Sequence, residues 1–444
     1  MANTTATGPA GGTPDDISAV TARLRSPAYL RVLLVATLIG VPISAAAYYF
    51  LQLVRMLDGW TYHDLPRALG FPATPLWWPL PALALGGVFT ALAIRYLPGR
   101  GGHVPLDGFS TTELPAPITL PGVLVAALAS LGAGAVLGPE APLIALGGGL
   151  ALCAVRLARR DVSQQALALI AATGSFAAIS ALLGSPIIGA VLLMEVSTFA
   201  GPALGLVLIP GLLASGIGSL VFTGLDALTG LGKVSLTLPA VPPLGRPQLS
   251  EFGWALVIGA LAAVAGAAIR WLSSRWRTPA EQQPLLLTPM AGLIVAGLAI
   301  AYTTTTSRDF ADVLFSGQSA LGPLLTHGAE YSVPALLLLV ACKGLAYSLC
   351  LSSFRGGPVF PAMYLGAAGG VALSHLPGLP LVAGAAMGIG AMCVVMLKLP
   401  LTSVLLATLL LYSDGVAVMP LVIVAVVVAY VVSARLAPVG RGSR

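Results

Sequence analysis

The stretch LGPEAPLIALGGG, residues 137–149, places one carboxylate, Glu140, between two prolines and ahead of three glycines in an otherwise apolar segment. Apolar runs long enough to cross a bilayer recur from about residue 29 to residue 437. Only 9% of the 444 residues are charged, whereas a soluble domain carries roughly a quarter. The sequence therefore predicts a polytopic membrane protein in a lipid bilayer.

The backbone of such a protein must find its hydrogen-bond partners within the chain, which leaves helices and closed barrels. The alternating pattern of barrel strands does not occur in the sequence, so we expect an all-α protein. The 52 glycines and 35 prolines, many of them inside apolar runs, favour short, broken and tilted helices that pack closely.

The composition argues against several other classes. The net charge of +6 forms no dense basic patch, so we expect no nucleic-acid partner. The sequence contains neither a nucleotide-binding glycine loop followed by Lys and Ser/Thr nor an HExxH motif, so we expect no enzyme. The four cysteines lie in apolar segments without metal-ligand spacing and predict packing residues, with no metal and no cofactor; they are Cys153, Cys342, Cys350 and Cys393.

Composition shifts along the chain predict its organisation. A polar, disordered tail with arginines just before the first span indicates a cytoplasmic N-terminus, and the apolar chain indicates a multi-pass protein of the plasma membrane. A proline-rich stretch without helical periodicity separates two apolar halves. The expected parts are a tail (1–27), a first membrane repeat (28–222), a linker (223–250), a second membrane repeat (251–437) and a short tail (438–444).

The two halves carry related motifs. When GPEAPLIALG (138–147) is placed under GPVFPAMYLG (357–366), five of ten positions are identical. A proline that begins an apolar helix follows each motif at a similar distance, from Pro142 to Pro186 and from Pro361 to Pro400. The matching order predicts an internal repeat, and repeated, broken membrane helices are typical of transporters whose site lies at the repeat interface.

The glycine–proline breaks are expected to begin helices inside or at the edge of the membrane. Proline suits the first turn of a helix, whose N–H groups are unpaired and carry partial positive charge. Several helix starts that converge can bind an anion without a full cation. The predicted starts are GGHVP (101–105), GPEAP (138–142), GSP (184–186) and GGPVFP (356–361).

Glu140 is the one carboxylate among these predicted helix starts. An acid inside the membrane is a hypothesis for a functional site, and here it is a tethered anion that competes with a permeant one. Its protonation removes the competition. A structural alternative is that Glu140 only caps the start of its own helix.

At these residues the chain resembles the CLC family of chloride channels and chloride/proton antiporters over about residues 29–437. The family motifs GSGIP, GREGP and GxFxP are similar to GGHVP, GPEAP and GPVFP here. The resemblance implies a CLC-type inverted repeat and a homodimer in which each subunit has its own pore for chloride or a similar anion. It implies that Glu140 is the gate and that the anion is bound by Gly102, His103, Val104, Gly138, Ala141, Val359 and Phe360.

The chain departs from the family pattern at three motif positions. Gly102 replaces the serine of the central site, His103 replaces a glycine, and Pro139 replaces the basic residue before the gating glutamate. His103 either contacts the anion path or faces water as an ordinary exposed side chain. The family's final helix and its tyrosine have no counterpart in the sequence near Tyr412 or Tyr430, so we expect anion contacts from backbone amides alone.

Proton coupling remains open at this stage. Alignment on Pro186 places the family's inner glutamate at Val196, which resembles passive members, whereas a slip of one residue places it at Glu195. Glu195 is therefore either part of a proton path or an acid at the membrane edge paired with an arginine.

Other substrates also remain open, namely fluoride or a small organic anion, or a cation exchanged for protons. Three cations lie in apolar context. We expect Lys343 and Lys398 to extend towards an interface and Arg355 to line a vestibule.

Overall fold

The computed structural model describes residues 25–109, 116–157, 164–180, 182–183, 185–196, 202–232, 247–411 and 415–436. Regular structure in these residues is helical apart from one isolated β-bridge. The helices of the first half are α2 (Pro27–Gly59), α3 (Leu65–Ala68), α4 (Pro79–Tyr96), α5 (Leu120–Gly132), α6 (Glu140–Leu157), α7 (Gln164–Ile179), α8 (Pro186–Val196) and α9 (Pro202–Thr229). Those of the second half are α10 (Leu249–Gln282), α11 (Pro284–Thr306), α12 (Gln318–His327), α13 (Val333–Ser353), α14 (Val359–Ser374), α15 (Leu381–Leu397), α16 (Pro400–Leu409) and α17 (Gly415–Leu436).

Short helical turns join these elements. They are the π-helical turn η1 (Trp60–Asp64) and the 3-10 turns η2 (Pro98–Gly101), η3 (Pro105–Asp107), η4 (Pro117–Thr119), η5 (Phe310–Asp312) and η6 (Gly328–Glu330). Eight helices among the described residues are long and apolar enough to cross a membrane. Further apolar helices have only 10–17 residues, so the prediction of broken helices is confirmed.

Helix α12 and the end of helix α9 differ from what the sequence predicts. Helix α12 was not predicted, because Gln318–His327 mixes polar and apolar residues without a long apolar run. Helix α9 continues to Thr229, beyond the predicted start of the linker, and ends where Gly230 adopts a left-handed φ of +64°. Residues 233–246 of that linker, residues 1–24 of the predicted N-terminal tail (1–27) and all of the predicted C-terminal tail (438–444) lie outside the described residues.

The predicted repeat is visible in how the helices pack. Gly147 on α6 and its repeat mate Gly366 on α14 each lie against a glycine of the following helix. A Cβ on Gly147 would lie 2.3 Å from the Gly174 carbonyl oxygen on α7, and a Cβ on Gly366 would lie 2.1 Å from that of Gly388 on α15. The pairs α6–α7 and α14–α15 therefore pack by the same close backbone approach, which only glycine permits.

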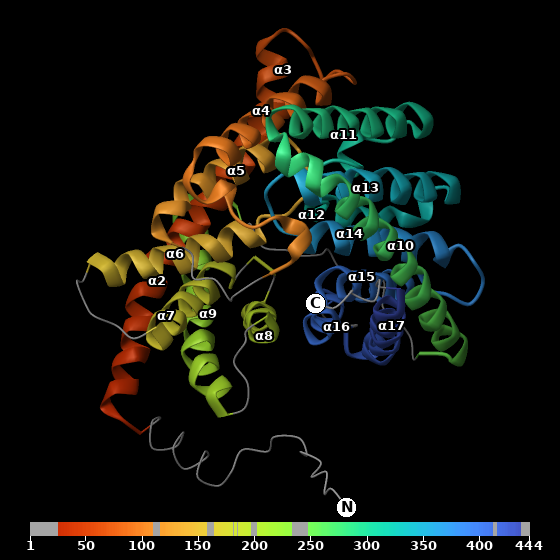
Figure 1. The fold of residues 1–444 in the computed structure, drawn as a ribbon. Helices are drawn as coiled ribbons and strands as arrows, with labels where there is room; N and C mark the ends of the chain where they lie inside the picture. The colour runs from red at the N-terminus through yellow and green to blue at the C-terminus, as the bar shows by residue number, and fades with distance from the viewer. Residues whose placement is uncertain are drawn as a thin grey trace, which may run out of the picture.

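The two halves lie side by side, with α2–α9 on one side and α10–α17 on the other (Figure 1). They meet where α4 packs against α11: a Cβ on Gly87 would lie 2.7 Å from Cα of Pro289. They meet again at an antiparallel bridge between Gly138 and Gly357. The Gly138 N–H donates to the Gly357 carbonyl at 2.8 Å, and the Gly357 N–H donates back at 2.5 Å. Repeat-matched residues thus contact each other at the centre of the molecule.

Candidate functional site

The Gly138–Gly357 bridge brings the starts of α6 and α14 together around the Glu140 side chain. Glu140 is the first residue of α6 and is fully buried. Its Oε1 accepts a hydrogen bond of 2.9 Å from the backbone N–H of Phe360. Phe360 is the second residue of α14, so this N–H is one of the donors that a helix start leaves unpaired. The carboxylate of one repeat is therefore bound by the helix start of the other.

The second carboxylate oxygen lies against glycine backbone. A Cβ on Gly357 would lie 1.7 Å from Glu140 Oε2, and a Cβ on Gly138 would lie 2.2 Å from it. Oε2 has no hydrogen-bond partner among the described residues. We call the space bounded by Gly138, Gly357 and the Phe360 amide the gate site. It can hold a carboxylate only because both glycines lack side chains.

The gate site suits an anion. The N-terminal end of α14 carries partial positive charge, and the donor that reaches Glu140 is an amide rather than a cation. Glu140 does more than cap its own helix, because its Oε1 binds an amide 220 residues away in the sequence. An unpaired amide at a helix start is also the kind of donor that binds free anions.

Four of the residues predicted to form the site lie together and are buried: Gly138, Glu140, Val359 and Phe360. Three others, Gly102, His103 and Ala141, line an adjacent cavity of about 490 Å³. The remaining predicted residue, Val104, is half-buried against the hydrophobic core.

The prediction that GGHVP begins a helix is wrong. After Gly102, whose φ is +89°, the only regular element before residue 110 is the three-residue 3-10 turn η3. Gly108 closes that turn with a φ of +74°. Left-handed glycines on both sides stop a helix from extending, so this segment contributes loop backbone rather than a helix dipole.

The cavity lies between the GGHVP loop and residues that are next to the gate site in the sequence. Its lining includes Ala141, next to Glu140, and Gly356, next to Gly357. The complete lining is Gly99, Arg100, Gly101, Gly102, His103, Ala116, Thr119, Val123, Ala141, Pro142, Ala145, Arg355 and Gly356. The expectation that Arg355 lines a vestibule is therefore consistent with its position.

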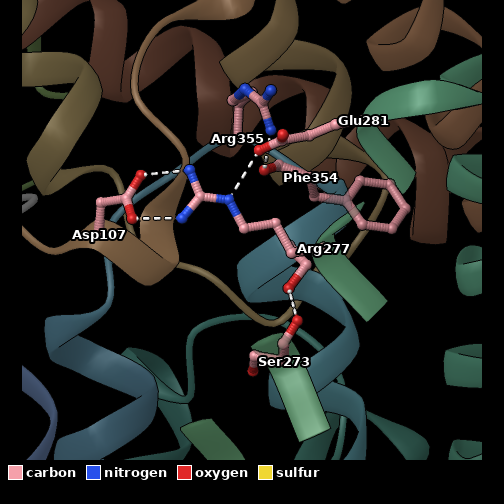
Figure 2. A network of polar contacts seen from close by, with 7 residues as sticks. Asp107, Ser273, Arg277, Glu281, Phe354 and Arg355 are labelled. Carbon is pink, nitrogen blue, oxygen red and sulfur yellow. Dashed lines mark hydrogen bonds and ion pairs between the residues drawn. The ribbon is translucent and has the colours of Figure 1, made fainter. Parts of the chain in front are cut away.

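A polar network that sequence reasoning missed lies beside Arg355 (Figure 2). The Arg277 guanidinium donates to both oxygens of Asp107 at 2.6 and 3.0 Å and to Glu281 Oε1 at 2.8 Å. The four-residue spacing of Arg277 and Glu281 on a helix is a signal that the sequence offered. Asp107 is 170 residues from Arg277, so no local sequence signal indicated this pair.

Glu195 has partners other than the predicted arginine. Its carboxylate accepts from the backbone N–H groups of Leu401 and Thr402, both at 2.8 Å, and from the Thr402 hydroxyl at 2.6 Å. These amides belong to the first turn of α16. Among the described residues no ion pair includes Glu195. The observed partners of Glu195 are therefore amides and a hydroxyl, and Glu195 joins α8 to the start of α16.

We expect Glu195→Gln to lower the free energy of unfolding by about 1 kcal/mol, because the amide replaces one acceptor with a donor at a helix start. Thermal unfolding of the purified protein in detergent measures the change. Glu330→Gln is the control, since its carboxylate is exposed and pairs only with His327. An equal shift in both variants contradicts the capping role.

The expectation that Lys343 extends towards an interface is wrong. Lys343 is fully buried, and its Nζ donates to the carbonyls of Asp312, Val313 and Leu314 at 2.9, 3.1 and 3.0 Å. Lys398, by contrast, is exposed and donates to the Ser433 hydroxyl at 2.8 Å. Lys343 therefore holds the segment between η5 and α12 against α13.

Three tyrosine hydroxyls surround the carboxylate of Asp312 in the same region. Tyr302 and Tyr331 donate to it at 3.3 Å and Tyr364 at 3.4 Å. Burial raises the pKa of Asp312, while the Lys343 charge and these hydrogen bonds oppose the rise. Burial, followed by the charge of Asp312, raises the pKa of Tyr331 to about 12. The cluster joins η5 to α11, to the end of η6 and to α14.

Comparisons with solved structures agree with this architecture. A slow cyanobacterial Cl⁻/H⁺ antiporter matches with a TM-score of 0.73 at 21% identity, covering 92% of this chain and 95% of that one. A CLC-type fluoride/proton antiporter matches with a TM-score of 0.69 at 21% identity, covering 92% and 96%. In sequence, YfeO of Escherichia fergusonii, described as a candidate ion-transport protein, is 26% identical over 363 residues, covering 80% of this chain and 82% of YfeO.

The fold consists of inverted repeats of broken membrane helices, and helix starts from both repeats meet at a buried carboxylate. This arrangement defines a membrane anion-transport protein of the CLC type. The model of the family described as Voltage gated chloride channel matches residues 86–434, which is most of the chain. The chain belongs to that family.

Proposed function

We propose that this protein transports chloride across the plasma membrane and that Glu140 is its gate. The observation that carries the proposal is the hydrogen bond from the Phe360 N–H to Glu140 Oε1, in which a tethered anion occupies the free donor of a helix start. Chloride takes that donor when the carboxylate withdraws. The proposed path also includes Gly102, His103, Val104, Gly138, Ala141 and Val359. We propose a homodimer in the lipid bilayer with a cytoplasmic N-terminus.

The polarity of the gate site favours an anion over a cation as the substrate. A cation/proton antiporter needs several acceptor oxygens around its ion, commonly carboxylates. The residue that binds the Glu140 carboxylate in the described structure offers a backbone donor instead. This observation supports an anion as the substrate. If the protein does not transport chloride, fluoride is the next anion to test.

The experiment uses purified protein in liposomes loaded with high chloride, with chloride efflux and external pH followed together for wild type and Glu140→Ala. We expect Glu140→Ala to remove the dependence of chloride flux on pH, because no side chain then competes for the gate site. Glu330→Ala, an exposed loop variant, is the control. Absence of chloride flux in both wild type and Glu140→Ala contradicts the chloride proposal.

The same assay decides between passive and proton-coupled transport. Uphill proton movement with chloride, lost in Glu140→Ala, indicates an exchanger. If Glu195→Gln also loses proton movement while chloride still passes, Glu195 is the inner proton acceptor. Chloride efflux without proton movement in the wild type indicates a passive member, in agreement with the alignment of Val196 on the inner glutamate.

A further inference from the structure

Arg355 is a cation held rigidly beside the gate site. Its residue is 6% exposed, and its backbone N–H donates to the Ser130 hydroxyl at 3.0 Å. Its stem lies under the GGHVP loop, since a Cβ on Gly101 would lie 3.4 Å from Arg355 Cγ. The side chain lines the cavity of about 490 Å³ that reaches Ala141 and Gly356. Its charge is therefore fixed between the two anion motifs.

One edge of the Arg355 guanidinium has no partner among the described residues. Nη1 donates to the Phe354 carbonyl at 3.1 Å, whereas the buried Nε has no hydrogen-bond partner. Nε and Nη2 form the side-on fork of a guanidinium, which matches two coplanar oxygens of one anion. A buried charged donor without a partner is unfavourable, so an anion that fills this fork stabilises the site.

Two nearby acids, Asp107 and Glu281, offset the Arg355 charge, but neither binds its guanidinium. Asp107 and Glu281 are both paired with Arg277 (Figure 2). The three together carry a single negative charge when the acids are ionised. Among the described residues no carboxylate lies within the 4.0 Å ion-pair distance of Arg355. Asp107 and Glu281 therefore attract the Arg355 charge from a distance, but neither carboxylate binds the Nε–Nη2 edge of its guanidinium.

The size of the cavity also bears on the ligand. A volume of about 490 Å³ is many times that of a bare halide and holds a polyatomic anion with water. A halide gains little from a planar fork, because it offers one round acceptor rather than two directed oxygens.

We propose that this cavity binds a small planar oxyanion, with the two-oxygen geometry of a carboxylate or nitrate, on the side-on fork of Arg355. The inference rests on the proposed function in that the cavity lies on the proposed anion path. It adds a cation-anchored binding site that is distinct from the gate site.

The test is isothermal titration calorimetry of the purified protein with formate, nitrate and chloride, each added to anion-poor buffer. The variants are Arg355→Lys, which keeps the charge but loses the fork, and Ala145→Leu, which fills the cavity from α6. Arg67→Met is the matched control, because Arg67 is an exposed arginine on α3 that does not line the cavity. Gel filtration confirms that each variant is folded.

We expect wild type to bind formate and nitrate more tightly than chloride. Arg355→Lys should weaken formate and nitrate about tenfold and chloride less than threefold, while Arg67→Met changes each less than threefold. Unchanged oxyanion binding in Arg355→Lys, or an equal loss for chloride, overturns the proposal. If Arg355→Lys does not fold, Ala145→Leu decides, with an expected loss of about tenfold.

Oxyanion binding and chloride flux test the two proposals separately. If wild type shows no chloride flux in liposomes but binds formate and nitrate in an Arg355-dependent manner, the proposed function is wrong and the oxyanion site stands. If chloride flux depends on Glu140 but no oxyanion binds, the oxyanion site is wrong and the proposed function stands.

Discussion

Gly357→Ala is expected to reduce anion flux at least tenfold, even in a protein that also carries Glu140→Ala. The added Cβ would lie 1.7 Å from the present place of Glu140 Oε2 and 3.1 Å from the backbone nitrogen of Ala141. In the single variant the carboxylate must leave the gate site. In the double variant the methyl group still fills the space that we propose the permeant anion shares with the carboxylate, so we expect that removal of Glu140 does not restore flux.

The measurement is chloride efflux from liposomes for the two single variants and the double variant. Gly369→Ala is the matched control: it lies on the same helix, α14, and no atom lies within 4 Å of its added Cβ. Its flux should equal that of the wild type. If the double variant conducts as fast as Glu140→Ala alone, the carboxylate and the anion do not share the gate site.

Lys343→Met is expected to lower the free energy of unfolding by about 3–5 kcal/mol, the typical cost of removing one partner from a buried charged network. The substitution leaves the carbonyls of Asp312, Val313 and Leu314 without their donor in a buried place. It also removes the Lys343 charge, which favours the ionised form of the Asp312 carboxylate. Thermal unfolding in detergent measures the loss.

Lys398→Met is the control for Lys343→Met, since Lys398 is exposed and makes one side-chain hydrogen bond. Its effect should stay within about 1 kcal/mol. Adding Asp312→Asn to Lys343→Met separates the two causes: partial recovery assigns the loss to the unpaired carboxylate, and no recovery assigns it to the carbonyls. A small effect of Lys343→Met itself contradicts the structural role.

The sequence supported reliable inference about the helices and their repetition. Apolar runs, and proline at positions that suit a first helical turn, are local signals, and they placed α6, α8 and α14 to within a residue or two of their observed starts. Repeat-matched residues such as Gly147 and Gly366 could be paired by position alone. Helix α12 was not predicted because it has no long apolar run, and it packs against α14 instead.

Local sequence signals predicted only part of the site. Glu140 stood out because a lone carboxylate among helix starts is costly and therefore informative. The motif GGHVP looked like the other glycine–proline breaks, yet its left-handed glycines form a loop. Backbone φ at a glycine is decided by neighbouring contacts, and the sequence of the motif carries no record of it.

By itself the sequence determined a polytopic all-α membrane protein and its internal repeat, and it singled out the carboxylate that we propose as the gate. Hydropathy, proline chemistry and an isolated charge are properties of short segments. Only the tertiary structure decided the partners: Glu140 with the Phe360 amide, Glu195 with the start of α16, Lys343 with the carbonyls after η5, and Arg355 with the cavity. Each of these places residues from distant segments together. Such contacts depend on how helices pack, and no local pattern encodes which buried donor will meet which acceptor.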